Sequence, residues 1–200
     1  MKVEQYVMGM FCTNTYLLEI NGECIVIDPA SKAEKMIEII GDRKLLAILL
    51  THGHFDHIKA VDGLVKHFNC PVYLNALDKP LTKDKNQGND FGLESVASIS
   101  VKTNDLKEGL MEIGPFKFEV IFTPGHTEGS VCYKFTDAIF TGDTLFRMSV
   151  GRTDLNGGSD NKLKASLRLL KNIQNNLTVY PGHDAITCLD DEKAFNPFLK

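Results

Sequence analysis

The chain has 200 residues, of which 43% are hydrophobic and 24% are charged, and its formal net charge at pH 7 is -4. These proportions indicate a folded protein with a sizeable core, and no apolar run approaches the ~18 residues that a membrane-spanning helix needs. Because a net acidic protein has little general affinity for nucleic acid, the expected partner is a small-molecule substrate, with no nucleic acid and no membrane.

The first half of the chain is predicted to alternate strands and helices. Residues 14–20 and 24–28 form strands joined across Asn21-Gly22, a dipeptide typical of tight hairpins. A capping box that starts at Ser31 predicts a helix whose apolar positions run from Ala33 to Ile40. The next expected elements are a buried strand at 45–50, a helix that begins near residue 57 and ends at Phe68, and a short strand at 71–75.

The second half opens with a long irregular segment. Residues 78–107 are polar and contain several Gly and Asn residues, so they are predicted to form a loop or lid that contacts substrate. A hairpin through Gly114-Pro115 follows, with Phe116, Phe118 and Phe122 on its core face. The remaining expected elements are strands at 131–135, 138–141 and 177–180, a helix capped by Ser159 with a stripe from Leu163 to Ile173, and a short helix near 190–195.

Both halves show the same layout, in which strands are followed by a helix and another strand. Such apolar strands are buried best when two β-sheets pack together and helices cover their outer faces. No linker rich in Pro, Gly or Ser separates the two halves. The sequence therefore predicts an α/β protein that forms a single domain over residues 1–200.

The cysteines indicate the compartment in which the protein works. Five Cys residues are widely separated and form no Cys-x-x-Cys pair, which is typical of reduced thiols in a cytosolic protein. Residues 1–5 lack the apolar stretch of a secretory signal, so we expect a cytoplasmic location. Cys24 and Cys132 lie in strand-like runs and are expected to be small core residues.

Five of the six histidines lie in three short clusters, and each cluster directly follows a strand-like run. The clusters are His52-Gly53-His54-Phe55-Asp56-His57, Gly125-His126 and Gly182-His183, and a fourth strand-like run ends at Asp143. Side chains at the ends of rigid strands can converge on one site. Neutral imidazole and ionised carboxylate are good ligands for zinc, manganese and iron. The sequence therefore predicts a two-metal hydrolytic centre.

Other polar residues near these clusters are predicted to have supporting roles. Asp28 and Thr51 are expected to orient metal ligands rather than to act as catalysts. Arg147 and Arg152 are candidates either for attracting an anionic substrate or for holding a loop, and the second role is favoured. His67 lies on a predicted helix away from the clusters and is interpreted as an ordinary surface histidine.

The motif His-x-His-x-Asp-His at 52–57, followed in order by His126, Asp143 and His183, resembles the metallo-β-lactamase superfamily. The resemblance extends from Ile25 to Leu199. It implies a four-layer αββα sandwich, in which two mixed β-sheets pack together with helices on the outer faces. It also implies that His52, His54 and His126 hold one ion, that Asp56, His57 and His183 hold the other, and that Asp143 bridges both.

Two further segments narrow the resemblance to one branch of the superfamily. Gly142-Asp143-Thr144-Leu145-Phe146 and Gly151-Arg152-Thr153-Asp154 resemble small glyoxalase II-like hydrolases, that is, enzymes similar to hydroxyacylglutathione hydrolase. This resemblance implies hydrolysis of a thioester. Glyoxalase II proper continues with a helical region that contributes basic residues for glutathione, whereas only residues 184–200 follow His183 here. The acyl group and the thiol carrier therefore stay open.

The expected chemistry follows from two neighbouring divalent cations, with zinc expected first and iron or manganese as alternatives. Such a pair lowers the pKa of a shared water, so that hydroxide is available to attack a carbonyl carbon at neutral pH. Asp56 is the candidate catalytic residue, because it can orient the nucleophile or relay a proton while it also binds metal. A thiol has an ordinary pKa of about 8.5, so a thiolate leaves with little assistance from an acid.

Several other functions remain open. A persulfide dioxygenase of the same superfamily uses a single iron, for which His52, His126 and Asp143 would suffice. A hydrolase of another ester or amide is a further alternative, although β-lactam hydrolysis is disfavoured because many dizinc lactamases have Cys where this chain has Asp143. A metal-storing or metal-sensing protein without turnover belongs to a different class, and a set of seven ligands with a bridging carboxylate is an unusual way to bind ions tightly without an open position for chemistry. The oligomeric state is not predicted.

Overall fold

The computed structural model describes residues 1–200, with the side chain of Asp90 as the exception. The chain forms two compact units, one made of residues 1–106 and 113–116 and the other of residues 107–112 and 117–200. Each unit has its own sheet, helices and core. The single domain predicted over 1–200 stays a prediction.

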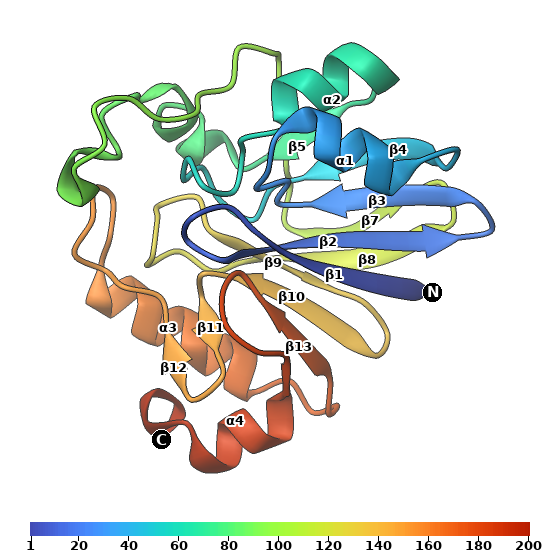
Figure 1. The fold of residues 1–200 in the computed structure, drawn as a ribbon. Helices are drawn as coiled ribbons and strands as arrows, with labels where there is room; N and C mark the ends of the chain where they lie inside the picture. Colours follow the sequence, from blue (N-terminus) through green and yellow to red (C-terminus); the bar gives the residue numbers. More distant parts are fainter. The chain divides into compact units, whose positions relative to one another are not determined.

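The first unit is built on a six-stranded mixed sheet with strand order β1-β2-β3-β4-β5-β6 (Figure 1). The strands are β1 (Lys2–Met8), β2 (Thr13–Ile20), β3 (Glu23–Ile27), β4 (Lys44–Leu49), β5 (Val72–Leu74) and β6 (Asn104–Asp105). The β1-β2 and β2-β3 pairs are antiparallel, whereas β3 to β6 are paired in parallel. Asn21 and Gly22 both have positive φ values, of 52° and 79°, which confirms the tight hairpin predicted between β2 and β3.

Two helices, α1 (Ala33–Ile40) and α2 (Val61–Phe68), cover one face of this sheet. Met36 and Ile40 of α1 and Leu64 of α2 are fully buried and belong to the same hydrophobic cluster as Val26 and Ile48 of the sheet. Apolar residues at helical spacing therefore form the core contacts of both helices, as the sequence pattern predicts.

The structure differs from the prediction at both helix starts. The N-cap of α1 is Lys32, which makes no side-chain capping bond, so the predicted capping box at Ser31 is wrong. The second helix begins at Val61 rather than near residue 57. The preceding residues form turns instead, because the His57 N–H bonds to the His54 carbonyl and the Ala60 N–H bonds to the Pro29 carbonyl, each at 3.0 Å.

Two parts of the first unit are more ordered than predicted. Strand β1 was not predicted, because its alternation of polar and apolar residues is short and partly exposed. The segment predicted as a loop over 78–107 contains short 3₁₀ turns, η1 (Ala76–Asp78), η2 (Leu81–Lys83) and η3 (Asn89–Phe91), and ends near β6. Irregular backbone connects these turns.

The second unit is also built on a six-stranded sheet, with strand order β14-β13-β10-β9-β8-β7. The strands are β7 (Gly109–Ile113), β8 (Phe116–Phe122), β9 (Val131–Lys134), β10 (Ala138–Gly142), β13 (Thr178–Pro181) and β14 (Thr187–Cys188), and β11 (Leu145–Phe146) pairs separately with β12 (Ser149–Val150). The β10-β13 pair is parallel, whereas β8-β9, β9-β10 and β13-β14 are antiparallel. This sheet is therefore mixed as well.

The helices of the second unit are α3 (Asp160–Lys171) and α4 (Leu189–Phe195), followed by the short turn η4 (Pro197–Leu199). Ser159 caps α3 by accepting a hydrogen bond from the Lys162 N–H, as predicted. Leu163 and Leu167 of α3 pack with Ile139 and Val179 of the sheet in one hydrophobic cluster. No helix in the described part of the chain is long and apolar enough to cross a membrane.

An aromatic group fills another part of the second unit. Phe118 and Phe135 have ring centroids 5.1 Å apart, Phe135 and Phe140 are 5.6 Å apart, and Phe140 stacks on Tyr180 at 4.8 Å. Cys132 on β9 is fully buried in the hydrophobic cluster that contains Ile139 and Leu163, and burial raises the pKa of its thiol to about 12. These observations confirm the predicted α/β class with two mixed β-sheets and the core roles of Phe118 and Cys132.

Candidate metal centre

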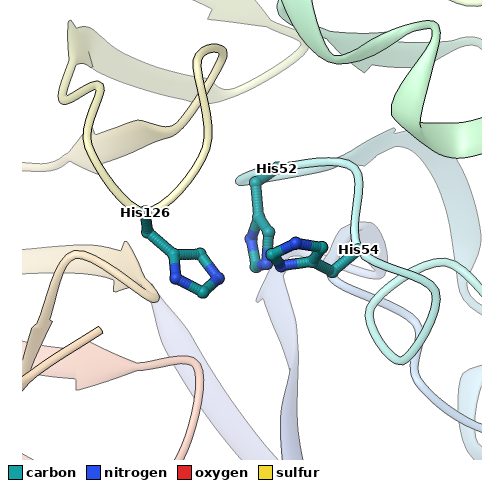
Figure 2. A group of neighbouring side chains, drawn as sticks. All are labelled: His52, His54 and His126. Carbon is teal, nitrogen blue, oxygen red and sulfur yellow. The ribbon is translucent and has the colours of Figure 1, made fainter. Parts of the chain in front are cut away.

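The first group of predicted ligands lies in the loop that follows β4, which we call the metal loop (residues 50–60). His52 and His57 are almost completely buried, and His54 is 8% exposed. The ring of His52 lies 4.8 Å from that of His54 and 4.2 Å from that of His57, measured between centroids. Nε2 of His57 is 3.5 Å from Oδ2 of Asp56. Figure 2 shows how closely His52 and His54 lie on this loop.

Asp28 fixes the orientation of two imidazoles, that of His57 directly and that of His52 through Thr51. Its Oδ2 accepts hydrogen bonds from Thr51 Oγ1 at 2.6 Å and from His57 Nδ1 at 2.9 Å, while its Oδ1 accepts the Thr51 N–H at 2.8 Å. Because the Thr51 hydroxyl proton is donated to Asp28, His52 Nδ1 must donate to Thr51 Oγ1, which lies 2.9 Å away. Both imidazoles therefore carry the proton on Nδ1, which leaves the lone pair of Nε2 as the one that could bind a metal ion, and Asp28 and Thr51 orient these rings as expected from the sequence.

Three residues that sequence reasoning missed hold the metal loop in place. Thr13 Oγ1 donates to Asp56 Oδ2 at 2.8 Å, and the buried Asp78 accepts the Gly53 N–H at 2.9 Å. Gln87 Oε1 accepts the Phe55 N–H at 3.1 Å. A Cβ atom at Gly53 would lie 2.8 Å from the Asp78 carbonyl oxygen, so this close approach requires glycine. No local motif marks these contacts, which join residues 25 to 43 positions apart.

The second group of predicted ligands lies at the ends of three strands of the second unit. His126 follows β8, Asp143 follows β10 and His183 follows β13. The Gly182 N–H bonds to the Gly142 carbonyl at 2.8 Å, so the ends of the parallel strands β10 and β13 are held together. Asp143 Oδ2 lies 3.4 Å from His126 Nε2 and 3.4 Å from His183 Nε2. One carboxylate oxygen is thus close to both imidazoles.

Residues 151–154 hold His126 and Asp143 in position. His126 Nδ1 lies 2.7 Å from the Arg152 carbonyl oxygen, which only accepts, so Nδ1 donates and Nε2 is the nitrogen that could bind a metal ion. A Cβ atom at Gly151 would lie 1.8 Å from the Asp143 carbonyl oxygen and 3.2 Å from His126 Nδ1. Only glycine fits there. Figure 2 shows His126 on its loop after β8.

The two candidate arginines have different surroundings. The Arg152 guanidinium binds the Asp154 carboxylate through Nε at 2.6 Å and Nη2 at 2.7 Å, and this hydrogen bonding lowers the pKa of Asp154 to about 2. The side chain of Arg152 therefore holds its own loop, which is the role favoured from the sequence. Arg147 is exposed in the turn between β11 and β12. Phe146 contacts the His183 ring edge to face, with centroids 5.9 Å apart.

Three groups of His and Asp side chains offer ligand atoms within 4.8 Å of one another: His52, His54 and His126 (Figure 2), then Asp56, His57 and His183, and finally Asp28, His52 and His57. The oxygens of Asp28 already accept three hydrogen bonds, one of them from Nδ1 of His57, so Asp28 orients the neighbouring groups and is not proposed as a ligand. Imidazole trios and imidazole-carboxylate sets suit zinc, iron and manganese, so the residues present fit divalent ions of this kind. Among the described residues, His67 is in none of these groups and instead contacts the Phe68 ring.

Comparison with known proteins identifies the family. The model of the metallo-beta-lactamase superfamily matches residues 9–183. The probable metallo-hydrolase YqgX of Bacillus subtilis is 36% identical over 206 residues, which cover 100% of this chain and 98% of YqgX. The hydroxyacylglutathione hydrolase GloC of Haemophilus influenzae is 35% identical over 182 residues, which cover 87% of this chain and 86% of GloC.

Comparison with solved structures identifies the same family as the sequence comparison. The BLEG-1 B3 metallo-beta-lactamase has a TM-score of 0.93 and 35% sequence identity, with 100% of both chains covered. TTHA1623, in a di-iron-bound form, has a TM-score of 0.90 and 38% identity, with 98% of this chain and 100% of TTHA1623 covered. Both the sequence matches and these structures extend over nearly the whole chain. The protein therefore belongs to the metallo-β-lactamase superfamily, whose members are generally metal-dependent hydrolases, and it has the α/β fold of that superfamily.

Proposed function

We propose that the protein is a hydrolase with a two-ion centre. His52, His54 and His126 would hold one ion, and Asp56, His57 and His183 would hold the other. Asp143 would be shared by the two ions. The observation that carries this proposal is the position of Asp143 Oδ2, which lies 3.4 Å from His126 Nε2 and 3.4 Å from His183 Nε2. One oxygen is thus adjacent to a ligand nitrogen of each ion, as a bridging carboxylate requires.

The chain's own residues prepare the reaction in three ways. When bound, the ion pair supplies an acidified water and a Lewis acid for a carbonyl oxygen. Asp28 and Thr51 keep His52 and His57 in the tautomers that bind through Nε2. Thr13 holds Asp56 through Oδ2, and we assign to Asp56 the orientation of the attacking water and the transfer of its proton.

We propose a thioester as the substrate. The likeness to GloC, which is named a hydroxyacylglutathione hydrolase, supports this choice. The chemistry supports it too, because a thiol with an ordinary pKa of about 8.5 leaves as thiolate without a strong general acid. Glutathione itself is not required by this proposal.

We also propose that the ions are zinc and that the protein is cytoplasmic. Zinc suits the donor set best, and iron is the alternative because the related TTHA1623 was solved in a di-iron-bound form. A cytoplasmic location is supported by five free cysteines, of which Cys24, Cys70 and Cys132 are buried with raised pKa values.

A β-lactam is the second candidate substrate. It is favoured by the likeness to BLEG-1, which is named a B3 metallo-beta-lactamase. Hydrolysis of this strained amide would use the same two-ion centre, and it differs from thioester hydrolysis in the nitrogen leaving group. The alternative of a single-iron persulfide dioxygenase requires only His52, His126 and Asp143.

One experiment separates these functions. Elemental analysis of the protein as purified is combined with assays on a panel of acyl-glutathione and acyl-coenzyme A thioesters, a chromogenic cephalosporin, and glutathione persulfide with an oxygen electrode. We expect two ions per chain and thioester hydrolysis, and we expect both to be lost in His126→Ala but kept in the control variant His67→Ala. Two bound ions with every thioester intact would reject thioester hydrolysis, and oxygen consumption with one iron per chain would favour the dioxygenase.

A further inference from the structure

Three phenylalanines from separate segments of the first unit meet in one cluster, which we call the Phe trio. Phe11 belongs to the loop between β1 and β2, Phe55 to the metal loop, and Phe91 to η3. The centroid of Phe11 lies 5.4 Å from that of Phe55 and 5.0 Å from that of Phe91, and Phe55 and Phe91 are 6.3 Å apart. All three pairs are edge to face, with interplanar angles of 80°, 72° and 61°.

The trio is attached directly to the ligand-bearing loop. Phe55 lies between the ligands His54 and Asp56 in the sequence. The segment that carries Phe91 is joined to it by Gln87, which accepts the Phe55 N–H at 3.1 Å. The loop that carries Phe11 is joined by Thr13, which donates to Asp56 Oδ2 at 2.8 Å. The segments that carry Phe11 and Phe91 are therefore each joined to the metal loop, which carries Phe55, by a separate hydrogen bond.

The Phe trio exposes part of its apolar side chains to solvent. Phe91 is 40% exposed, Phe11 and Phe55 are half-buried, and the adjacent Met10 is 73% exposed. Exposed aromatic surface gathered from three segments beside a reactive centre is typical of a ligand-binding surface. A cluster that served only to fasten loops would gain from burying Phe91 rather than leaving it exposed.

From this arrangement we infer that the Phe trio is a binding subsite for an apolar, preferably aromatic, group of the substrate. The inference rests on the proposed thioester hydrolysis and specifies the substrate class: a thioester that carries such a group within a few bonds of its carbonyl carbon. This apolar group belongs to either the acyl part or the thiol part of the thioester. An added ring continues the edge-to-face arrangement, and we expect its contact with Phe91 to change kcat/KM about tenfold.

The test compares matched substrates on the metal-loaded protein. For the acyl side, S-phenylacetyl-N-acetylcysteamine is compared with S-acetyl-N-acetylcysteamine. For the thiol side, the S-acetyl ester of benzyl mercaptan is compared with that of ethanethiol. The variants are Phe91→Ala and Phe91→Leu, and the control is Leu77→Ala, which truncates a side chain that is 60% exposed in the same segment. The metal content of each preparation is measured.

We expect wild type to prefer the aromatic member of one pair by about tenfold in kcat/KM. Phe91→Ala should abolish this preference mainly through KM, Phe91→Leu should retain part of it, and Leu77→Ala should leave it unchanged. In Phe91→Ala the loss should be larger for the aromatic member of the pair than for the smaller one, Leu77→Ala should match wild type on both members, and all preparations should contain the same amount of metal. An unchanged preference in Phe91→Ala, an equal loss for both members of a pair, or no preference in wild type would overturn the inference.

A binding measurement separates this inference from the proposed function. If wild type hydrolyses no thioester, the proposed function fails, and calorimetry with phenylacetate and acetate tests the subsite alone. Tighter binding of phenylacetate to metal-loaded wild type, lost in Phe91→Ala and kept in Leu77→Ala, would support the subsite. Equal binding of the two carboxylates, or the same preference in Phe91→Ala, would reject it.

Discussion

At the scale of single residues, the centre depends on carboxylates whose surroundings assign each of them one task. Asp28 has a φ of 50°, a left-handed conformation that Asp tolerates better than most residues, and this turn directs both oxygens at Thr51 and His57. Asp143 instead presents one oxygen to two imidazoles of neighbouring strand ends. Similar side chains thus orient His57 and Thr51 in one place and lie between two imidazoles, in the position proposed for a bridging ligand, in the other.

The bridging role of Asp143 is tested by Asp143→Ala. We expect hydrolysis to fall by at least ~100-fold, because the charge that stabilises the transition state depends on both ions. Metal content should fall below two ions per chain, as measured by elemental analysis after dialysis. The matched control is Asp137→Ala, which removes an exposed carboxylate from the turn that precedes β10. An Asp143→Ala protein that retains both ions and full turnover would contradict the bridge.

The orienting role of Asp28 is tested by Asp28→Asn. Oδ2 accepts from both Thr51 and His57, and an amide nitrogen placed there would face two donors. We expect metal affinity to fall about 10- to 100-fold, measured by competition with a chromogenic chelator. Asp42→Asn, an exposed carboxylate after α1, should leave the affinity unchanged. Equal affinities in the two variants would show that Asp28 does not orient the ligands.

At the scale of elements, the positions of the candidate ligands after strand ends were predictable because these residues follow strongly apolar strands. The buried residues of β4 and β10 mark strands clearly, and a Gly next to a His or Asp marks the turn that ends each strand. The contacts of Asp78, Gln87 and Thr13 were not predictable, because they depend on how distant segments meet rather than on local spacing. The start of α2 was predicted wrongly for the same reason, since the Pro29 carbonyl takes the Ala60 N–H.

The link between the 76–92 segment and the metal loop is tested by Gln87→Ala. The variant removes the acceptor of the Phe55 N–H, a hydrogen bond worth about 1 kcal/mol. We expect amide exchange of a peptide covering residues 50–60 to accelerate about fivefold, measured by hydrogen-deuterium exchange and mass spectrometry. Gln174→Ala, which changes an exposed side chain after α3, serves as the control. Unchanged exchange in Gln87→Ala would show that the segment does not restrain the loop.

At the scale of the whole molecule, acid stability depends in part on a charged network on β1. Glu4 accepts hydrogen bonds from Lys2 and from the Tyr6 hydroxyl and also pairs with Arg43 at 3.1 Å. The hydrogen bond from Lys2, followed by that from Tyr6, lowers the pKa of Glu4 from 4.5 to about 2. A carboxylate with a lowered pKa stabilises the folded state above its unfolded pKa, and this contribution is lost as the pH falls through the folded pKa.

The direction of this pH dependence predicts how the stability of a Glu4 variant changes with pH. In the metal-free protein, Glu4→Gln should unfold at lower urea concentration than wild type above pH 5, and the difference should shrink between pH 4.5 and about pH 2. Urea midpoints at several pH values measure the difference. Glu34→Gln, an exposed residue in the first turn of α1, controls for loss of charge alone. A pH-independent difference would mean that the lowered pKa does not contribute.

The parallel pairing of β10 and β13 has a consequence for how proteins of this type diverge. Asp143 and His183 are separated by a long stretch of chain that includes β11, β12 and α3, yet their spacing is set by the bond between Gly182 and the Gly142 carbonyl. Insertions or deletions between the two strands can therefore change β11, β12 or α3 without moving Asp143 relative to His183. A one-residue slip within the strand pair would instead move His183 away from Asp143 while leaving most of the intervening chain intact.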